Sequence, residues 1–542
     1  MNLLLRHLLL LTFSVLNSIV TGQELLQLNS YYSVSDHIAK DNCFSSSGSI
    51  YVTGEFNSEL IYGMNSSNGH PGPSIYLSKQ FEDGTMPFLR TWYSSQSAFV
   101  SKVAVKGDTL LVAGTFSDTL FVGEDTLVNE GFKAGYLVIL DTLGNINKTW
   151  MIPSYSSEIY DACFGNDGTI LLCGEFFNTM TVDQQIYDAP LGFNAFVIKL
   201  DETDLSAHWV NFSEGTATNA RAVGVDQYEN IYISGSYGDG TSFSGQTLPG
   251  VSGDHNFFIT SYSGNGALNW VRTITGPVQT HGLEQLVTSE GDIYIGGEYE
   301  VSVDVPQIGT LINAGLMDAF LAKLDRFGDY HWAKSVGGLD NDEVADIVSD
   351  ANGDPLFLLN GGQMEMNSET FSTAGFRAPL ILKLNKANGQ LVWDYRIPVA
   401  PSAGIAEAYS LDWNDSLITL CGSNRTGLFY FNEVIDSPNL DDSFWALLSD
   451  TLYTQSQLGF SEPENVEAIL VFPNPTTEGF FIQATDKSRV HSVQVINDLG
   501  EKVFESFENE KYIEVKGNLE HGVYVIVIKT DSTTHVKKLL RL

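Results

Sequence analysis

Seven polar residues recur at nearly constant spacing and could form one ring of ligand-binding groups. They are His37, Gln96, Glu158, Asn219, His281, Glu343 and Glu407, separated by 59 to 64 residues. Carboxylates, amides and imidazoles gathered in this way could bind a sugar or a cation, and paired carboxylates could carry out acid–base chemistry. Ordinary polar residues at the rim of a fold explain the same pattern, because the set is defined by its place in a repeat and not by a motif.

Motifs for known catalytic centres are absent from the sequence. It contains no G-x-S-x-G, no H-E-x-x-H, no phosphate-binding loop and no closely spaced cysteine pair for zinc. The segment DANGD, residues 350–354, places Asp350, Asn352 and Asp354 at alternate positions, as a calcium loop does, but the distal glutamate is missing. Turn chemistry explains Asp, Asn and Gly there equally well. We therefore predict no catalytic residue, metal or cofactor.

A repeated glycine phrase shows which elements would hold the ring. It reads GTILLCGEFF at residues 168–177, and its glycine recurs every 60 to 64 residues, at Gly54, Gly114, Gly174, Gly235, Gly297, Gly361 and Gly422. Short runs rich in Val, Ile, Leu, Tyr and Phe, bounded by turn residues, predict β-strands. A glycine at the end of such a run predicts a bulge or a close approach of two backbones.

A second phrase has the same period and combines an apolar strand, a turn and a tryptophan. It ends at Trp150, Trp209, Trp332 and Trp393, with weaker copies at Trp92 and Trp270. A period of this length built only of strands is typical of four-stranded propeller blades. The last blade lacks an outer strand, and the segment 25–33 lacks a partner. We predict an all-β fold: a seven-bladed β-propeller over residues 23–450, closed by this N-terminal strand. The starts of the first strands, with the seven polar residues, would then lie near the axis on one face.

The repeat also resembles a known family. The segments DNDEVADIVSDANGDPLFLLNG and GLMDAFLAKLDRFGDYHWAKSVGG are similar to the units of bacterial seven-bladed β-propeller repeats, over residues 25–450. This resemblance implies a fold and no fixed activity.

The two ends of the chain predict an export route. Residues 1–22 have a short basic start, an apolar core and small residues before Gln23, as a signal peptide does. A polar linker, 451–468, precedes alternating strands over 469–542 that predict a small C-terminal β-sandwich.

The sandwich resembles the type A sorting domain of the type IX secretion system of Bacteroidetes. The matching positions are Pro473, Asn474, Pro475, Gly479, Asp498, Gly500, Gly522, Tyr524, Lys537 and Lys538. The resemblance implies the secretion machinery as a partner, passage through the periplasm, and release or display at the outer cell surface.

The net charge limits the classes of partner, and the cysteines suggest candidate disulfides. The net charge of −38 excludes nucleic acid as the expected partner, because phosphate binding needs a basic surface. We expect a monomer without a membrane span after the signal peptide. Cys163 and Cys173 share one predicted hairpin, and Cys43 and Cys421 lie in blades that become neighbours on closure, so both pairs are candidate disulfides. The alternative is that all four are small buried side chains.

Three functions are compatible with these features. The sequence favours a secreted, non-catalytic module that binds a glycan or a protein, because varied loops on a rigid ring suit recognition and no catalytic motif is visible. The first alternative is a hydrolase or lyase acting on extracellular polysaccharide. The second is a structural or adhesion component of the cell surface.

Overall fold

The computed structural model describes most of the chain. The described residues are 25–30, 37–57, 59–62, 65–68, 73–82, 84–250, 255–371, 377–397, 405–425, 428–430, 433–435, 442–450, 469–472, 479–484, 489–496, 502–510, 512–516, 522–530 and 534–541. The predicted signal peptide and the predicted linker lie outside them. The chain divides into two compact units, Met1–Leu452 and Tyr453–Leu542.

The first unit is all-β over its described residues and propeller-like. Its main strands form seven antiparallel meanders of four strands each, and in the first six the strands follow in sequence order from the first strand outward. The first four are β2 (His37–Phe44), β3 (Ile50–Phe56), β6 (Ser74–Gln80) and β7 (Phe88–Ser94); β8 (Ser97–Lys106), β9 (Thr109–Ser117), β12 (Ala134–Asp141) and β13 (Ile146–Met151); β14 (Ser154–Phe164), β15 (Thr169–Val182), β16 (Gln185–Asp201) and β17 (Ala207–Glu214); and β18 (Thr218–Val225), β19 (Ile231–Tyr237), β22 (Asn256–Tyr262) and β23 (Leu268–Ile274).

The remaining three meanders follow the same pattern. They are β24 (Thr280–Val287), β25 (Ile293–Tyr299), β28 (Asp318–Leu324) and β29 (Tyr330–Gly338); β30 (Glu343–Ser349), β31 (Pro355–Gly361), β34 (Ala378–Leu384) and β35 (Leu391–Arg396); and β36 (Ala406–Asn414), β37 (Leu417–Asn424), β40 (Asp442–Ser449) and β1 (Leu25–Ser30). In the last sheet the outer strand is β1, which pairs antiparallel with β40 in a register that sets Leu28 opposite Ala446.

Short hairpins follow most second strands. They are β4 (Glu59–Tyr62) with β5 (Asn65–Asn68), β10 (Thr119–Val122) with β11 (Asp125–Val128), β20 (Ser242–Phe243) with β21 (Gln246–Thr247), β26 (Ser302–Val305) with β27 (Gly309–Ile312), β32 (Met364–Met366) with β33 (Glu369–Phe371), and β38 (Leu428–Tyr430) with β39 (Glu433–Ile435). Three of them pair with the outer strand of the preceding sheet, β10 with β7, β20 with β17 and β32 with β29, so they join neighbouring sheets.

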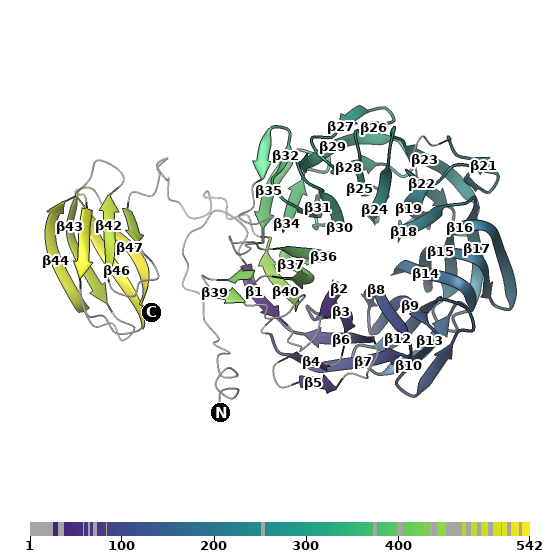
Figure 1. Cartoon of the computed structure of the whole chain (residues 1–542), viewed down its shortest axis with the longest axis horizontal. Coiled ribbons are helices and arrows are strands. Elements are labelled where there is room, and N and C mark those ends of the chain that lie inside the picture. The colour runs from purple at the N-terminus through teal and green to yellow at the C-terminus, as the bar shows by residue number, and fades with distance from the viewer. Residues whose placement is uncertain are drawn as a thin grey trace. The chain divides into compact units, whose positions relative to one another are not determined.

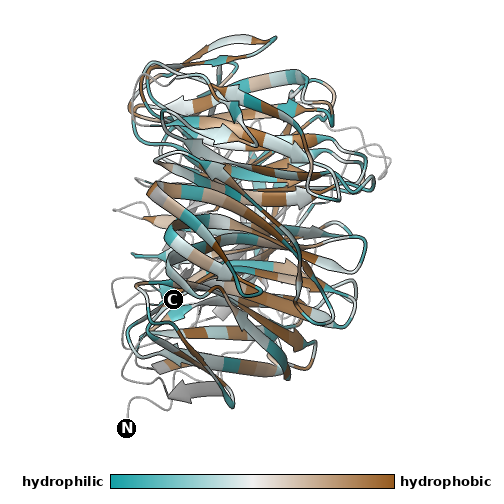
Figure 2. Cartoon of the chain, turned by 90° about the vertical axis from the view of Figure 1, so that its right-hand side faces the viewer, coloured by the Kyte–Doolittle hydropathy of each residue, from teal (hydrophilic) through white to brown (hydrophobic). Residues whose placement is uncertain are grey.

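The first strands surround the centre of this unit (Figure 1). Each contacts the next one, from β2 through β8, β14, β18, β24 and β30 to β36, and β36 contacts β2. The second and third strands are buried along almost their whole length, because both faces of each sheet pack against neighbouring sheets. In Figure 2 the strands carry brown stretches interrupted by white and teal, and teal is frequent at the turns.

The repeated glycine lies opposite a β-bulge in the first strand, as the phrase predicted. At Gly174 a β-carbon would overlap the carbonyl oxygen of Glu158, and the pairing register shifts between Ile159 and Asp161. The other six sheets have the same bulge at the equivalent position. In the sixth sheet the prediction was wrong. Leu359, not Gly361, pairs opposite the bulge, and the first glycine of the segment LLNGG lies two residues after this position.

The tryptophan phrase ties the third, fourth and fifth sheets each to the next one. Trp209, Trp270 and Trp332 donate their indole N–H to the backbone carbonyls of Gly264, Arg326 and Lys386, at 3.1, 3.0 and 3.2 Å, in the following sheet. Two expected copies are out of register. Phe88 stands opposite Lys79 in place of Trp92, and Trp150 lies two residues beyond the equivalent position, which Lys148 occupies opposite Ile139.

The second unit contains two sheets. One is β41 (Ile469–Phe472), β42 (Gly479–Ala484) and β45 (Tyr512–Lys516); the other is β44 (Lys502–Glu510), β43 (Val490–Ile496), β46 (Gly522–Thr530) and β47 (Thr534–Arg541). Ile482 and Val515 of the first sheet share one core with Val493, Tyr524 and Ile526 of the second. Two sheets around one core agree with the predicted sandwich. Nowhere in the described chain is there a helix with the length and hydropathy needed to cross a membrane.

We predict that Lys383 is needed to hold the sixth and seventh sheets together. Its ammonium lies 2.9 Å from Asp350 and 2.8 Å from Asp450, and all three side chains are at least 93% buried. Lys383→Met leaves two buried carboxylates without their cation, so the free energy of unfolding should fall by about 3–5 kcal/mol in urea titrations.

Lys148→Met is the matched control, since half-buried Lys148 has no ion pair among the described residues. Its free energy of unfolding should stay within about 0.5 kcal/mol of the wild-type value. Equal losses in the two variants would contradict the role assigned to Lys383.

Candidate functional site

Five of the seven predicted ring residues occupy equivalent positions. Glu158, Asn219, His281, Glu343 and Glu407 each stand next to the bulge of a first strand, opposite Glu175, Ser236, Glu298, Asn360 and Ser423. We call the surface around these positions the mouth. In the first two sheets the equivalent residues are Ile38 and Phe99, not the predicted His37 and Gln96.

The two misplaced residues have other surroundings. His37 is 1% exposed, and its Nδ1 lies 3.6 Å from Asp442 and accepts the backbone N–H of Ser443 at 3.3 Å. Gln96 is exposed in the bend between β7 and β8, three residues before Phe99. The predicted positions lie one residue before Ile38 and three residues before Phe99, because the pairing with the second strand fixes the register.

Residues just before the third strands complete the mouth. Lys133 donates to Glu158 at 2.6 Å, and Arg377 donates to Glu407 at 2.7 Å and lies 2.8 Å from Glu343. The ring of His255 lies 5.4 Å from that of His281. In each case the side chain from one sheet reaches the first strand of the next. The sequence offered a signal for two of them in the parallel phrases GFK (131–133) and GFR (375–377).

The acids that follow the repeat glycine also lie at the mouth. Burial raises the pKa of Glu55, Glu175 and Glu298. The effect is largest at Glu298, where burial and the nearby Glu343 raise the pKa to about 7 although Arg377 opposes this. A carboxyl group that is half-protonated near neutral pH can donate or accept a proton.

A second set of carboxylates, below the mouth, joins the first strands. Asp41 accepts the backbone N–H of Val103 at 2.6 Å, Asp161 that of Val223 at 2.8 Å, Asp346 that of Leu411 at 2.7 Å and Asp412 that of Phe44 at 2.6 Å, in each case from the next first strand. Burial raises the pKa of Asp41 to about 6 and that of Asp412 to about 7. These buried groups have a structural role.

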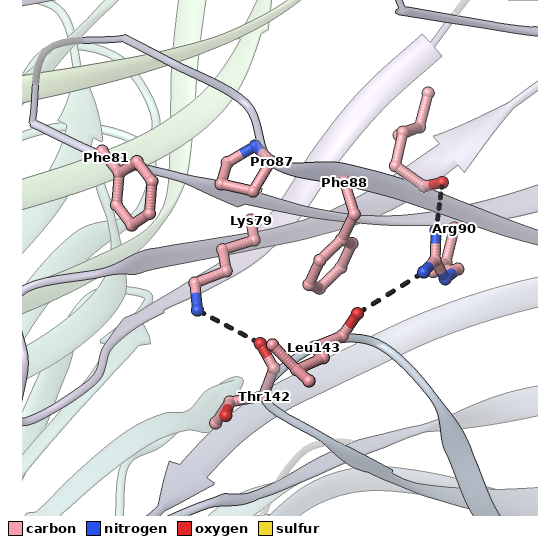
Figure 3. A pocket seen from close by; sticks show the side chains of 8 residues that line it. Lys79, Phe81, Pro87, Phe88, Arg90, Thr142 and Leu143 are labelled. Carbon is pink, nitrogen blue, oxygen red and sulfur yellow. Dashed lines mark hydrogen bonds between the residues drawn. The ribbon is translucent and has the colours of Figure 1, made fainter.

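A cavity of about 450 Å³ lies between the outer parts of the first two sheets. Lys79 donates to the carbonyl of Thr142 at 3.1 Å (Figure 3). Arg90 donates to the carbonyl of Gly144 at 3.0 Å. Arg272 makes the same contact with Gly328 at 3.0 Å, and Asn211 with Gly266 at 2.7 Å. The cavity therefore belongs to a repeated seam between sheets.

The loop at 350–354 is a turn. The Asp350 carboxylate accepts the backbone N–H groups of Asn352 and Asp354, both at 2.9 Å, and pairs with Lys383. Among the described residues, no group of three or more His, Cys, Asp or Glu side chains is arranged to hold a metal ion.

The four cysteines are free thiols in the structure, so neither candidate disulfide is present. Cys163 faces Leu171 and Cys173 faces Asp161, which makes the two cysteines diagonal neighbours, too far apart for a disulfide. Cys43 packs between the first and second sheets, whereas Cys421 packs between the last and the first.

The described residues of the sorting-signal prediction lie on strands. Gly479 begins β42, Gly522 begins β46, Tyr524 is 6% exposed in the core, and Lys537 and Lys538 pair with Ile526 and Val525. Pro473, Asn474, Pro475, Asp498 and Gly500 lie outside the described residues.

Comparison with known proteins identifies the C-terminal unit. Residues 470–541 match the family described as the secretion system C-terminal sorting domain. This domain marks the chain for export by the type IX secretion system to the cell surface or the extracellular space. The ulvan lyase NLR42 of Nonlabens ulvanivorans is 33% identical over 137 residues, which are 24% of this chain and 24% of that protein. The chain thus matches about a quarter of the length of this relative.

Among solved structures, a quinohemoprotein alcohol dehydrogenase from Comamonas testosteroni is similar with a TM-score of 0.39 at 9% identity, covering 83% of this chain and 79% of that one. The phage phi92 endosialidase is similar with a TM-score of 0.36 at 8% identity, covering 95% and 87%.

We predict a pH-dependent contribution of Glu298 to stability. Because its pKa is about 7 in the folded chain and about 4.5 when unfolded, the folded state binds more protons between these values, and stability falls as pH rises from 4.5 to 7. Glu298→Gln removes this loss. Relative to wild type, the variant should be about 1–3 kcal/mol more stable at pH 8 than at pH 5 in urea titrations. Glu290→Gln, at an exposed turn, is the control. A difference in free energy of unfolding between Glu298→Gln and wild type that does not change with pH would contradict the prediction.

We predict four reactive thiols per unfolded chain. Burial raises the pKa of all four cysteines, so the folded protein should react slowly with a thiol reagent, and all four should react in denaturant without added reductant. A pre-reduced sample sets the reference count. Two thiols fewer in the untreated sample would reveal a disulfide.

Proposed function

We propose that this chain is an exported, closed seven-bladed β-propeller that binds an extracellular polysaccharide at the mouth without cleaving it. In this proposal residues 1–22 are a signal peptide, 23–450 the propeller, 451–468 a linker and 469–542 the cleavable sorting domain. The seven meanders are the blades, and β1 closes the ring.

The observation that carries the proposal is the arrangement of charged groups at the mouth. Arg377 is held by Glu343 and Glu407, and Lys133 by Glu158, so their positions are fixed before a ligand arrives. Fixed donors and acceptors on a rigid scaffold lower the entropy cost of binding a hydroxyl-rich chain. Export to the outside of the cell and the partial similarity to an ulvan lyase both support a polysaccharide as the ligand.

A second candidate function is cleavage of such a polysaccharide. It is favoured by Glu298, which is half-protonated near pH 7, beside Glu343, which is ion-paired with Arg377. Two neighbouring carboxyl groups in different protonation states are what acid–base cleavage of a glycosidic bond requires. In this alternative Glu298 donates the proton to the departing oxygen.

The test is a panel of purified polysaccharides incubated with the full chain, with binding and the release of shorter products followed together. We expect binding without products, weakened by Glu158→Gln and His281→Ala. Products that disappear in Glu298→Gln would replace the binding function by the enzymatic one. A wild-type chain that neither binds nor cleaves any polysaccharide would overturn both and favour a structural or adhesive role.

A further inference from the structure

Exposed aromatic side chains gather at the mouth on the second and third sheets. Phe132 is 64% exposed, Tyr155 49%, Phe99 45% and Phe193 40%. Large apolar side chains are rarely this exposed in a group unless the surface binds something. We call these four residues, with half-buried Phe177 between them, the aromatic platform.

The platform consists of two groups of rings whose backbones are joined by a hydrogen bond. The Lys133 ammonium lies 6.0 Å from the ring centre of Phe99 and 5.9 Å from that of Phe132. The backbone N–H of Phe132 donates to the carbonyl of Tyr155 at 2.6 Å. The ring of Phe177 then lies 5.8 Å from Tyr155 and 5.2 Å from Phe193. The rings thus extend from β8 through β14 to β16.

Three of these residues are placed by the repeat. Phe99 is the residue next to the bulge, where other sheets have Glu158 or His281. Phe132 precedes Lys133, and Tyr155 precedes Ser156, which forms a bridge with Lys133. Because they lie on regular strands or beside them, their rings are held in place and lose little freedom when a ligand binds.

The local charge indicates which ligand fits. Among the residues that the structure describes, Lys133 is the one cation that contacts the platform rings; it is paired with Glu158 at 2.6 Å, and Glu130 is exposed nearby. The whole chain carries −38. Glu158, Glu130 and the net negative charge disfavour a polyanion at the platform, whereas a neutral ligand with an apolar face is not repelled.

We propose that the aromatic platform binds a neutral polysaccharide by stacking the C–H faces of its sugar rings on Phe132, Tyr155 and their neighbours. Pyranose rings present an apolar face and a rim of hydroxyls. The apolar face fits the exposed rings, and the hydroxyls can reach Lys133 and Glu158 at the edge. This inference rests on the proposed function and names its site and the charge class of its ligand.

The test compares binding of the full chain to neutral polysaccharides (cellulose, xylan, chitin, a β-1,3-glucan) and to polyanions (alginate, dextran sulfate). We expect retention on at least one neutral polysaccharide, unchanged between 50 mM and 500 mM NaCl because no ion pair with the ligand is involved. Phe132→Ala and Tyr155→Ala should each weaken this binding by about tenfold, since each removes a stacking surface.

Phe327→Ala is the matched control. Phe327 is 61% exposed and lies 4.8 Å from Arg326, so it resembles Phe132 in exposure and in its neighbouring cation, but it belongs to a turn of the fifth sheet. It should bind like wild type, and all three variants should unfold at the same urea concentration as wild type, because exposed side chains are removed.

The outcomes separate the two proposals. If wild type binds a neutral polysaccharide and Phe132→Ala and Tyr155→Ala bind it equally well, the platform is overturned and the proposed function stands. If only polyanions bind, and salt releases them, the neutral ligand class is overturned. If no polysaccharide binds, the proposed function fails together with the platform.

Discussion

The pairing of β1 with β40 is the contact on which the proposed ring depends. Without β1 the last sheet would have three strands and an open edge. The first and last sheets also meet at the centre, where Ser410 donates to Asp41 at 2.6 Å and Asp412 accepts the backbone N–H of Phe44. The outer and inner contacts together link the two ends of the repeat array. They hold β36, the first strand of the last sheet, beside β2, the first strand of the first sheet.

The shared position of the bulge in the first strands explains how the mouth is formed. The bulge recurs at one position in all seven first strands, so one residue of each strand reaches the same level beside it. Sheet-to-sheet contacts use these positions as well: Lys133 and Arg377 tie neighbouring sheets through Glu158 and Glu407. The same side chains therefore join neighbouring sheets and fix the groups that would meet a ligand in the proposed function.

Much of the fold could be predicted from the sequence because each repeat carries its own local signals. The apolar run and its glycine identified the second strands, and the unpaired segment 25–33 contained β1. The errors arose where the spacing of residues in the sequence differs from the register of strand pairing. Leu359 replaces the glycine two residues before Gly361, and Ile38 and Phe99 occupy the positions assigned to His37 and Gln96.

The candidate site was less accessible to prediction. Glu298 directly follows the repeat glycine Gly297, but its raised pKa depends on burial and on Glu343 from the next sheet. Arg377 precedes its partner Glu407 by 30 residues and contacts it only because adjacent sheets pack face to face. The aromatic platform likewise joins residues of two sheets, and no periodicity within one repeat reveals it.

The most direct test of the account is the effect of proline in β1 of the full chain. In an antiparallel strand, backbone N–H groups alternate between pointing to the partner and away from it, so one of the adjacent variants Leu28→Pro and Asn29→Pro must remove a hydrogen bond to β40. Unfolding in urea should shift to a clearly lower concentration for that variant, with all seven sheets lost in one transition. Unfolding curves identical to wild type for both variants would contradict the proposal that β1 closes the ring.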